Sequence, residues 1–474
     1  MPQSISALRD RIVEGPITKT LLWLAWPLIV SSLVNVSYSL IDAMWLGRLS
    51  SSAFSAVMVV FPVLAFIYSF GMGFSAAGTS IVSQYIGARE FKLAERSAGQ
   101  FIAFTAILAA CFSALSYSVA PWILAAMGVP HDVYPLAVAY MRTLSIGILL
   151  VFGGFAYVTI SNAIGDTRTP TKLNIAGALT NIALDPVFIF GVGPIPRLGV
   201  VGAAIATIIS RSPLTVIGLY RLFRGAYGFR IRLGDLRIER WWLRRAVSIG
   251  IPVSIQASIN SLGFVVLTSI VSHFGTIVIA SYGVATRLLN LISAFVNGVC
   301  QASATMIGQC LGASLEGRAK RVALRALALI LLVSGSAAAF LSLFPQLAIT
   351  AFIPNPEVVK VGSTLLHIFA PSIPFFSMLT LAGAVARGSG RTKIPAAIGV
   401  ARIWGLRIPL AYALPRLGLG VVGVWLAMAT SNYVAGLIAL AWVLRGGWAK
   451  GRAAVPIPSI ARGRAPISTS SKGD

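Results

Sequence analysis

Two aspartates point most directly to chemistry, because each lies inside a long apolar segment. Asp42 follows Tyr38 by four residues and Asp185 follows Asn181 by four, so each acid shares a helical face with a polar neighbour. An ionised Asp at the centre of a bilayer costs about 2.5–3.5 kcal/mol on insertion scales, so such a residue indicates function. A pair of carboxylates exchanges a proton readily or, when both are ionised, binds a small cation.

The other acids fall at the ends of the apolar segments or in the loops between them. The chain has 13 Asp and Glu, and only Asp42 and Asp185 are predicted at membrane depth. Thr207, in the next apolar segment, adds a hydroxyl, and a cation site needs several oxygens. A structural role as helix caps is the alternative, and Arg48 near Asp42 favours it there. No cofactor is expected beyond a coupling ion, H⁺ or Na⁺.

The composition places most of the chain in lipid. Apolar residues make up 57% and charged residues 11%, with a mean hydropathy of +0.85; soluble domains have about 25% charged residues. Transmembrane helices need about 20 mostly apolar residues. Twelve such segments are predicted, within 21–46, 53–78, 98–121, 134–160, 173–193, 199–221, 246–272, 277–303, 323–346, 361–385, 394–413 and 419–444.

The basic residues predict the orientation. Of 38 Lys and Arg, 29 lie on or at the edge of the N-terminal segment, alternate loops and the C-terminal tail, and five lie on the opposite loops. Because cytoplasmic loops carry an excess of Lys and Arg, we expect a multi-pass protein of the cell membrane with both termini in the cytoplasm. The net charge of +25 then reflects membrane topology, and no nucleic-acid partner is expected.

The two halves of the chain repeat each other at a constant offset of 225 residues. Matching pairs include Pro27 and Pro252, Asn35 and Asn260, Gln84 and Gln309, Gly165 and Gly390, and Pro170 and Pro395. Six helices per repeat is an even number, so both halves enter the membrane in the same sense, as in transporters that rock two lobes around a central site. We therefore predict an all-α membrane protein with twelve transmembrane helices in two six-helix lobes related by a parallel pseudo-two-fold repeat.

The domain boundaries follow from this repeat. We predict an N-terminal six-helix lobe over 1–221, a basic cytoplasmic linker over 222–245 and a C-terminal six-helix lobe over 246–445. The linker either recognises lipid phosphates as an amphipathic segment or simply lies on anionic headgroups. The tail over 446–474 is rich in Gly, Arg, Ser and Pro and is predicted to be disordered and cytoplasmic.

Several spaced motifs act together as a signature. They are Pro27…Tyr38-Ser-Leu-Ile-Asp42-Ala-Met-Trp45-Leu-Gly47, Gln84-Tyr-Ile-Gly87-Ala88-Arg89, Asn162-Ala-Ile-Gly165-Asp-Thr-Arg-Thr-Pro170 and Asn181-Ile-Ala-Leu-Asp185-Pro186. Over about residues 15–445 the chain resembles the multidrug and toxic compound extrusion (MATE) family, and its DinF-like prokaryotic branch in particular.

The resemblance implies an antiporter that expels organic, mostly cationic compounds using a proton or sodium gradient. In the DinF-like branch the cation site lies in the N-terminal lobe. Its residues carry over onto Asp42, Asn181, Asp185 and Thr207, all of which match in type. Other branches place acids in the C-terminal lobe, where this chain has none at membrane depth, and this departure favours the N-terminal site.

Other residues in the spans are candidates for the substrate path. Tyr38, Asn35, Phe155, Asn260 and Asn290 are candidates for lining a substrate cavity, and Pro27 and Pro186 for hinges. Helix packing is the commoner role of such residues. Facing the cavity, Arg287, Arg402 and Arg407 would repel cationic substrates or hold lipid phosphate; snorkelling or pairing with carbonyls is the alternative. His367 is either a proton relay or a packing residue.

The sequence therefore predicts a secondary active antiporter, and not an enzyme, that exports amphiphilic, cationic organic compounds in exchange for H⁺ or Na⁺ by alternating access. Its expected partners are small organic substrates and the lipid bilayer, and we expect a monomer. A flippase for lipid-linked oligosaccharides or another lipid is the alternative, which the three arginines keep open. A membrane-embedded transferase is disfavoured because no DDxxD, HxxxxD, HExxH or GxSxG signature occurs.

Overall fold

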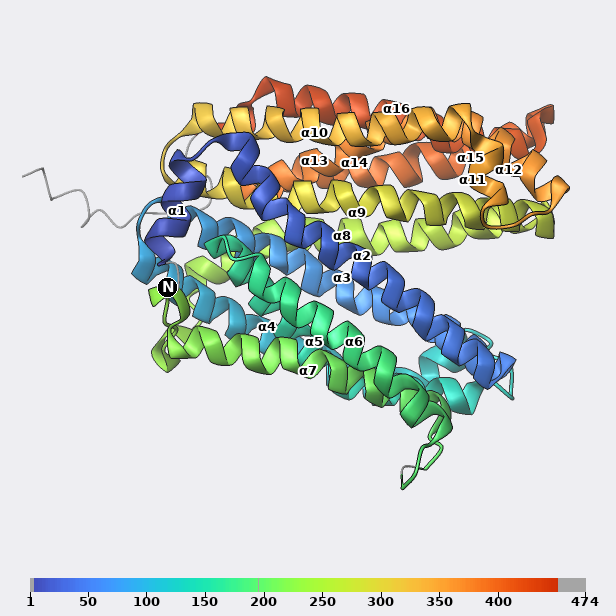
Figure 1. Cartoon of the computed structure of the whole chain (residues 1–474), viewed down its shortest axis with the longest axis horizontal. Coiled ribbons are helices and arrows are strands. Elements are labelled where there is room, and N and C mark those ends of the chain that lie inside the picture. The colour runs from blue at the N-terminus through green and yellow to red at the C-terminus, as the bar shows by residue number, and fades with distance from the viewer. Residues whose placement is uncertain (1–3, 195, 451–474) are drawn as a thin grey trace, which may run out of the picture.

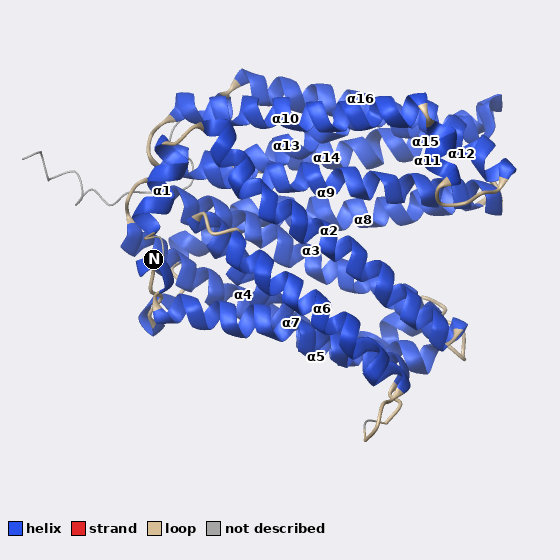
Figure 2. Cartoon of the chain, in the orientation of Figure 1, coloured by secondary structure: helices blue, strands red, loops and turns tan. Residues whose placement is uncertain are grey.

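The computed structural model describes residues 4–194 and 196–450, and every regular element in these ranges is a helix (Figure 2). After the short α1 (Ile5–Glu14), the first lobe contains α2 (Ile17–Leu49), α3 (Ser51–Gly87), α4 (Phe91–Ala126), α5 (Tyr134–Ile164), α6 (Arg168–Phe190) and α7 (Gly199–Arg224). The second lobe contains α8 (Arg240–Ser272), α9 (Thr276–Gly312), α10 (Glu316–Leu343), α11 (Pro345–Thr350), α12 (Pro356–Phe369), α13 (Ile373–Ser389), α14 (Lys393–Val400), α15 (Ile408–Leu414) and α16 (Gly420–Arg445).

The described helices cross the membrane twelve times, as the sequence predicts. Eleven stretches are long and apolar enough to span a bilayer. The last of them, Lys393–Arg445, contains two crossings, because the backbone leaves helical geometry at Leu417 and Gly418, where φ of Gly418 is +91°. After this reversal α16 packs back against α15. The predicted all-α membrane fold is therefore confirmed.

Two of the predicted spans are not continuous α-helices. The span predicted over 361–385 comprises α12 and α13, which are separated by a 3₁₀ turn at Ala370–Ser372 that contains Pro371. The ring of Pro371 removes a backbone donor, so the α-helical ladder is interrupted there. The span predicted over 394–413 contains a π-helical segment, Ala401–Arg407, between α14 and α15. Such wide turns occur mostly at functional sites.

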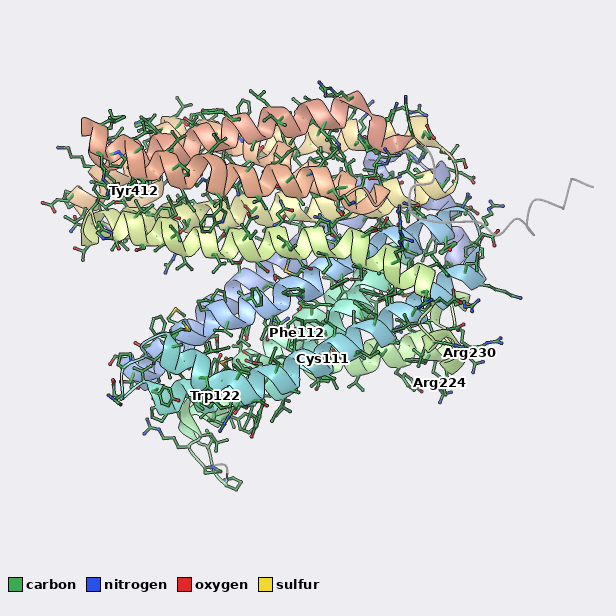
Figure 3. The ribbon with its side chains drawn as sticks, turned by 180° about the vertical axis from the view of Figure 1, so that it is seen from behind. Cys111, Phe112, Trp122, Arg224, Arg230 and Tyr412 are labelled. Atoms are coloured by element: carbon green, nitrogen blue, oxygen red, sulfur yellow. The ribbon has the colours of Figure 1, made fainter. Side chains whose placement is uncertain are left out.

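The two lobes meet at one end of the molecule and diverge toward the other (Figure 1). We call the end that carries α1 the narrow end and the opposite end the wide end. Seen from behind, Arg224 and Arg230 lie at the narrow end, whereas Trp122 of α4 and Tyr412 of α15 lie at the wide ends of the two lobes (Figure 3).

Contacts between the lobes at the narrow end come in reciprocal pairs. A Cβ atom at Gly87 would lie 2.0 Å from the Gln309 carbonyl oxygen, and one at Gly312 would lie 1.9 Å from that of Gln84. These two contacts interchange under the 225-residue offset, as a two-fold relation between the lobes requires. Only glycine permits backbones to approach so closely. The same offset relates two hydrogen bonds, from the Gln84 amide to the Gly388 carbonyl (3.0 Å) and from the Gln309 amide to the Ala163 carbonyl (2.7 Å).

Helix α1 contacts both lobes at the narrow end. Leu8 is buried in the apolar cluster of the first lobe, whereas Ile12 is buried among residues of α9, α10 and α13. The Arg9 guanidinium donates to the Gly87 carbonyl oxygen (3.0 Å). Arg9 also donates a hydrogen bond to Asp10 and thereby lowers the pKa of that carboxyl. From the sequence we expected only a polar N-terminal segment here, and not a helix.

The last described residues, up to Lys450, lie beside α1. Trp448, in the short helix Gly447–Ala449, is 2% exposed and packs in the same cluster as Ile12. Two hydrogen bonds from Arg391, to the carbonyls of Gly447 and Lys450, hold this segment. The predicted disordered tail therefore starts too early at 446, because an aromatic side chain anchors the first residues; 451–474 lie outside the described residues.

The predicted linker packs against the first lobe. The backbone N–H of Arg230 donates to Glu95 of α4 (2.7 Å), and that of Glu239 donates to Gln100 (3.2 Å). The Tyr227 hydroxyl donates to Asp166 (2.6 Å), and burial raises the pKa of Tyr227. These contacts fix the linker on the protein at its narrow end, which neither of the two lipid-based interpretations anticipated.

Candidate functional site

A small pocket lies inside the first lobe, between α2, α6 and α7. Its volume is about 10 Å³, which is room for about one water molecule. The residues lining it are Asn35, Tyr38, Leu173, Asn174, Gly177, Ala178, Asn181, Ser210, Arg211 and Leu214. The polar members come from all three helices, so the pocket joins elements that are distant in the sequence.

Asp185 lies beside this pocket and is fully buried, with 0% of its surface exposed. The Asn181 amide lies close enough to interact with this carboxylate, but within the described chain the buried oxygens of Asp185 and the amide atoms of Asn181 form no hydrogen bond of normal geometry. Leaving such groups buried without partners is costly. A proton on the carboxylate, or a small cation bound by carboxylate, amide and hydroxyl oxygens, would satisfy them.

Tyr38 connects the predicted cation-site residues. Its hydroxyl lies 3.5 Å from the Thr207 hydroxyl, and the charges of both Asp42 and Asp185 act on it. The two carboxylates also interact electrostatically with each other. The structure therefore brings together Asp42, Asn181, Asp185 and Thr207 around Tyr38, from α2, α6 and α7.

The local sequence explains these positions. Asp42 lies seven residues before the end of α2 at Leu49, so it is not a helix cap, and one of its oxygens is buried without a partner within the described residues. Pro186 follows Asp185 within α6 and contributes no backbone N–H. Pro27 lies within α2, where its carbonyl oxygen accepts a hydrogen bond from Thr171 (3.0 Å). Both prolines thus lie where a helix backbone is locally weakened.

Two residues of this site were not predicted. Arg211 lines the pocket, with its guanidinium carbon 5.7 Å from the Tyr38 ring centre. Tyr140 of α5 is 7% exposed and lies within the electrostatic reach of both aspartates. Arg211 follows Thr207 by one helical turn, so the i, i+4 spacing could have identified it. No sequence-spacing rule links Tyr140 to Asp42 or Asp185, because it is distant from both acids in the sequence.

The remaining substrate-path candidates lie in three different environments. Asn35 lines the first-lobe pocket and accepts a hydrogen bond from Asn174 (3.4 Å). Phe155 packs edge-on against Tyr68 between α3 and α5. Asn260 of α8 has a buried amide oxygen without a partner in the described chain, whereas Asn290 of α9 is exposed.

The three second-half arginines also differ in environment. Arg402 is 7% exposed and donates to the Asn432 amide oxygen (3.0 Å), and Arg407 donates to the same oxygen (2.6 Å). Both therefore point toward α16 inside the second lobe, away from lipid. Arg287 of α9 is exposed. His367 is exposed on α12, so its interpretation as a buried packing residue is wrong.

Twelve crossings in two related lobes, with two aspartates near a buried polar pocket in one of them, are the architecture of a membrane transporter. The chain belongs to the MatE family, whose model matches residues 27–187 and again 252–413, one match in each lobe. Members of this family are transporters and not enzymes. The prediction of a MATE transporter is confirmed.

The relatives and solved structures cover nearly the whole chain. The sequence is 27% identical over 404 residues to the probable multidrug resistance protein YoeA of Bacillus subtilis, covering 84% of this chain and 87% of that protein. It is 27% identical to the FAD transporter of Shewanella oneidensis, covering 91% and 95%. The structure of an outward-facing multidrug resistance MATE family transporter matches with a TM-score of 0.85 at 23% identity, covering 93% of this chain and 98% of that one.

Proposed function

We propose that this protein exports amphiphilic organic compounds across the cell membrane in exchange for H⁺ or Na⁺, acting as a monomer. The observation that carries the proposal is the buried Asp185 carboxylate, unpaired within the described chain, next to Asp42 and Tyr38. The multidrug resistance names of relatives support export as the direction of transport.

The coupling ion is proposed to bind in the first lobe only, as in the DinF-like branch. Between Arg240 and Arg445 the sequence has two acids, Glu316 and Glu357, and both lie in the first turn of a helix at the end of a span. The second lobe therefore offers no carboxylate at membrane depth. A membrane potential of 100 mV contributes about 2.3 kcal/mol per charge moved, which supports roughly a fiftyfold substrate gradient.

The narrow end is proposed to face the cytoplasm, because it carries the N-terminus and the arginine-rich linker. The lobes contact each other there and diverge at the wide end (Figure 1), so the described conformation corresponds to an outward-facing state. In this state Asp42 and Asp185 would take up H⁺ or Na⁺ from outside as substrate leaves. Release of that cation to the cytoplasm would complete the cycle.

The sequence and the relatives point to different chemical classes of substrate. The sequence predicts cationic compounds, yet one relative is named an FAD transporter, and FAD carries phosphate groups. The flippase alternative required guanidinium groups along a lipid-facing groove, but Arg402 and Arg407 bind α16 inside the lobe. Arg287 is exposed and is the one of the three arginines that still fits the flippase alternative.

The test is substrate transport in everted vesicles with proton and sodium gradients imposed separately. In an Asp185→Asn variant, transport driven by the coupling ion should fall about tenfold or more, since the titrating charge is lost. Glu357→Gln removes an exposed carboxylate at the wide end and should transport at the wild-type rate. Full transport by a correctly folded Asp185→Asn protein would refute the proposed coupling site.

A further inference from the structure

Arg287 occupies a defined position between the lobes. On the same helix, Gly298 packs against Ile29 of α2, since a Cβ there would lie 2.4 Å from the Ile29 side chain. Residue 287 precedes residue 298 by three helical turns, so it is rotated only about 20° from that face and lies about 17 Å nearer the wide end. By this geometry position 287 lies on the face of α9 that is turned toward the first lobe, in the half of the helix nearer the wide end.

The guanidinium of Arg287 is free to bind a ligand. The side chain is exposed, and it makes no hydrogen bond or ion pair with any residue of the described chain. Near the start of α9 a long cationic side chain would be expected to reach headgroups. A position about 17 Å along the helix, on the face turned to the other lobe, is instead suited to a molecule between the lobes.

The surface around Arg287 is apolar. The Ser69 and Ser258 hydroxyls form a 2.5 Å hydrogen bond between α3 and α8, and beyond it toward the wide end the same helix faces carry exposed apolar residues. Together with their counterparts on α2 and α9 they form what we call the interlobe surface: Leu33, Phe66, Leu262, Val265, Leu291 and Arg287. The interlobe surface thus combines five exposed apolar side chains with one positive charge.

No negative charge balances this arginine on the interlobe surface. Of the two acids at membrane depth in the first lobe, Asp185 is fully buried, and Asp42 of α2 is partly buried and interacts with Asp185 in the candidate cation site. In the second lobe, Arg407 lies close enough to Tyr282 of α9 to interact with it electrostatically. The groups that accept hydrogen bonds from Arg407 are all neutral, and so is the one group that accepts a hydrogen bond from Arg402. Unpaired charges in a medium of low dielectric constant act over long distances. The second lobe therefore presents a positive potential toward the space between the lobes.

We propose that the exported substrate is an amphiphilic organic anion, whose carboxylate or phosphate group binds Arg287 while its apolar part lies against the interlobe surface. This inference rests on the proposed function and replaces the cationic substrate class predicted from the sequence. A guanidinium binds planar oxyanions through two parallel, charge-assisted hydrogen bonds. A cationic substrate would be repelled by the same group.

The probes for the test are fluorescein and rhodamine 123, which share a xanthene ring but carry opposite charges. Binding to the purified full-length protein is measured by fluorescence anisotropy, and transport is measured in proteoliposomes under an imposed proton or sodium gradient. We expect the wild type to bind and transport fluorescein in preference to rhodamine 123. Arg287→Gln should weaken fluorescein binding about tenfold, since a charge-assisted hydrogen bond is lost.

Two further variants separate a specific role from a general effect of charge. Arg287→Lys keeps the positive charge and should retain most fluorescein binding. Arg416→Gln removes an exposed guanidinium at the wide end, stacked on Tyr412, and should bind fluorescein as the wild type does. Preference for rhodamine 123, or unchanged fluorescein binding in Arg287→Gln, would overturn the proposal.

A lipid headgroup carries the same anionic chemistry, so a third arm uses fluorescently labelled phosphatidylglycerol in the proteoliposomes. Protein-dependent movement of this lipid between leaflets, without fluorescein transport, would contradict a small organic anion as the substrate. Asp185→Asn should lose coupled transport and keep fluorescein binding. If that variant transports normally while Arg287→Gln still loses binding, the coupling site is wrong and the substrate class stands.

Discussion

At the scale of single residues, the candidate cation site of the first lobe contains two acids and, beside Tyr38, one positive charge. Asp42 and Asp185 interact with each other and with Tyr38, and the Arg211 guanidinium carbon lies 5.7 Å from the centre of the same tyrosine ring. Arg211 forms no ion pair with either acid in the described conformation. A fixed positive charge beside Tyr38, the residue on which both acids act, would oppose the binding of a second cation, so we expect Arg211 to weaken the binding of the coupling ion.

Replacing Arg211 tests this interaction. In Arg211→Gln, the concentration of H⁺ or Na⁺ that gives half-maximal transport should fall about tenfold, because one nearby charge contributes on the order of 1–2 kcal/mol at an effective dielectric constant near 20. Arg211→Lys keeps the charge and serves as the matched control. The measurement is the transport rate as a function of ion concentration in proteoliposomes. An unchanged half-maximal concentration in Arg211→Gln would show that its charge does not reach the carboxylates.

Residues in both lobes show what could and could not be inferred from the sequence. Asp185 was identifiable because an acid in an apolar segment is costly, and Asn181 because it lies one helical turn away. Tyr140 was not identifiable, since its position depends on how α5 packs in the lobe. The orientation of Arg402 toward Asn432 depends on the π-helical segment, which places residues five apart near one acceptor. No apolar pattern predicts such a turn.

At the scale of elements, close contact between α3 and α9 depends on glycine. Gly87 and Gly312 approach backbone of the opposite lobe, and the repeat relates the two positions. The sequence revealed this pair as part of the repeat, but their contact with each other's helix follows only from the assembly of the lobes. The number of spans was predicted, but α3, α4 and α9 extend about ten residues beyond the predicted apolar segments, and the interruption at Pro371 was not predicted, because the apolar run continues through it.

Gly312→Ala tests whether this contact holds the narrow end closed. The added Cβ would lie 1.9 Å from the Gln84 carbonyl oxygen, so the helices must separate, and we expect a lower melting temperature in detergent and slower transport. Gly335→Ala is the matched control, because a Cβ at this position in α10 meets nothing within 4 Å. The Gly335→Ala substitution should leave stability unchanged or should stabilise α10 by up to about 1 kcal/mol. Equal behaviour of the two variants would argue against the close approach.

At the scale of the whole molecule, alternating access requires the narrow end to open. The sequence predicts two lobes but not the angle between them, because conformations of such transporters differ by only a few kcal/mol and share most of their contacts within each lobe. Helix α1 spans both lobes at this end, with Leu8 in one apolar cluster and Ile12 in the other. We therefore expect α1 to stabilise the closed narrow end.

Cys310 reports on this opening, because it is fully buried on α9 in the same cluster as Ile12. With the exposed Cys111 replaced by serine, Ile12→Asp should accelerate maleimide labelling of Cys310 about tenfold, since a buried charge weakens the contact of α1 with the second lobe. Ala7→Asp adds the same charge to the exposed face of α1 and should leave the labelling rate unchanged. Cys300 lies ten residues nearer the start of α9, is also fully buried, and should stay unlabelled in every folded variant. If both aspartate variants label Cys310 at the wild-type rate, α1 does not hold the narrow end closed, and the contacts between α3 and α9 must do so alone.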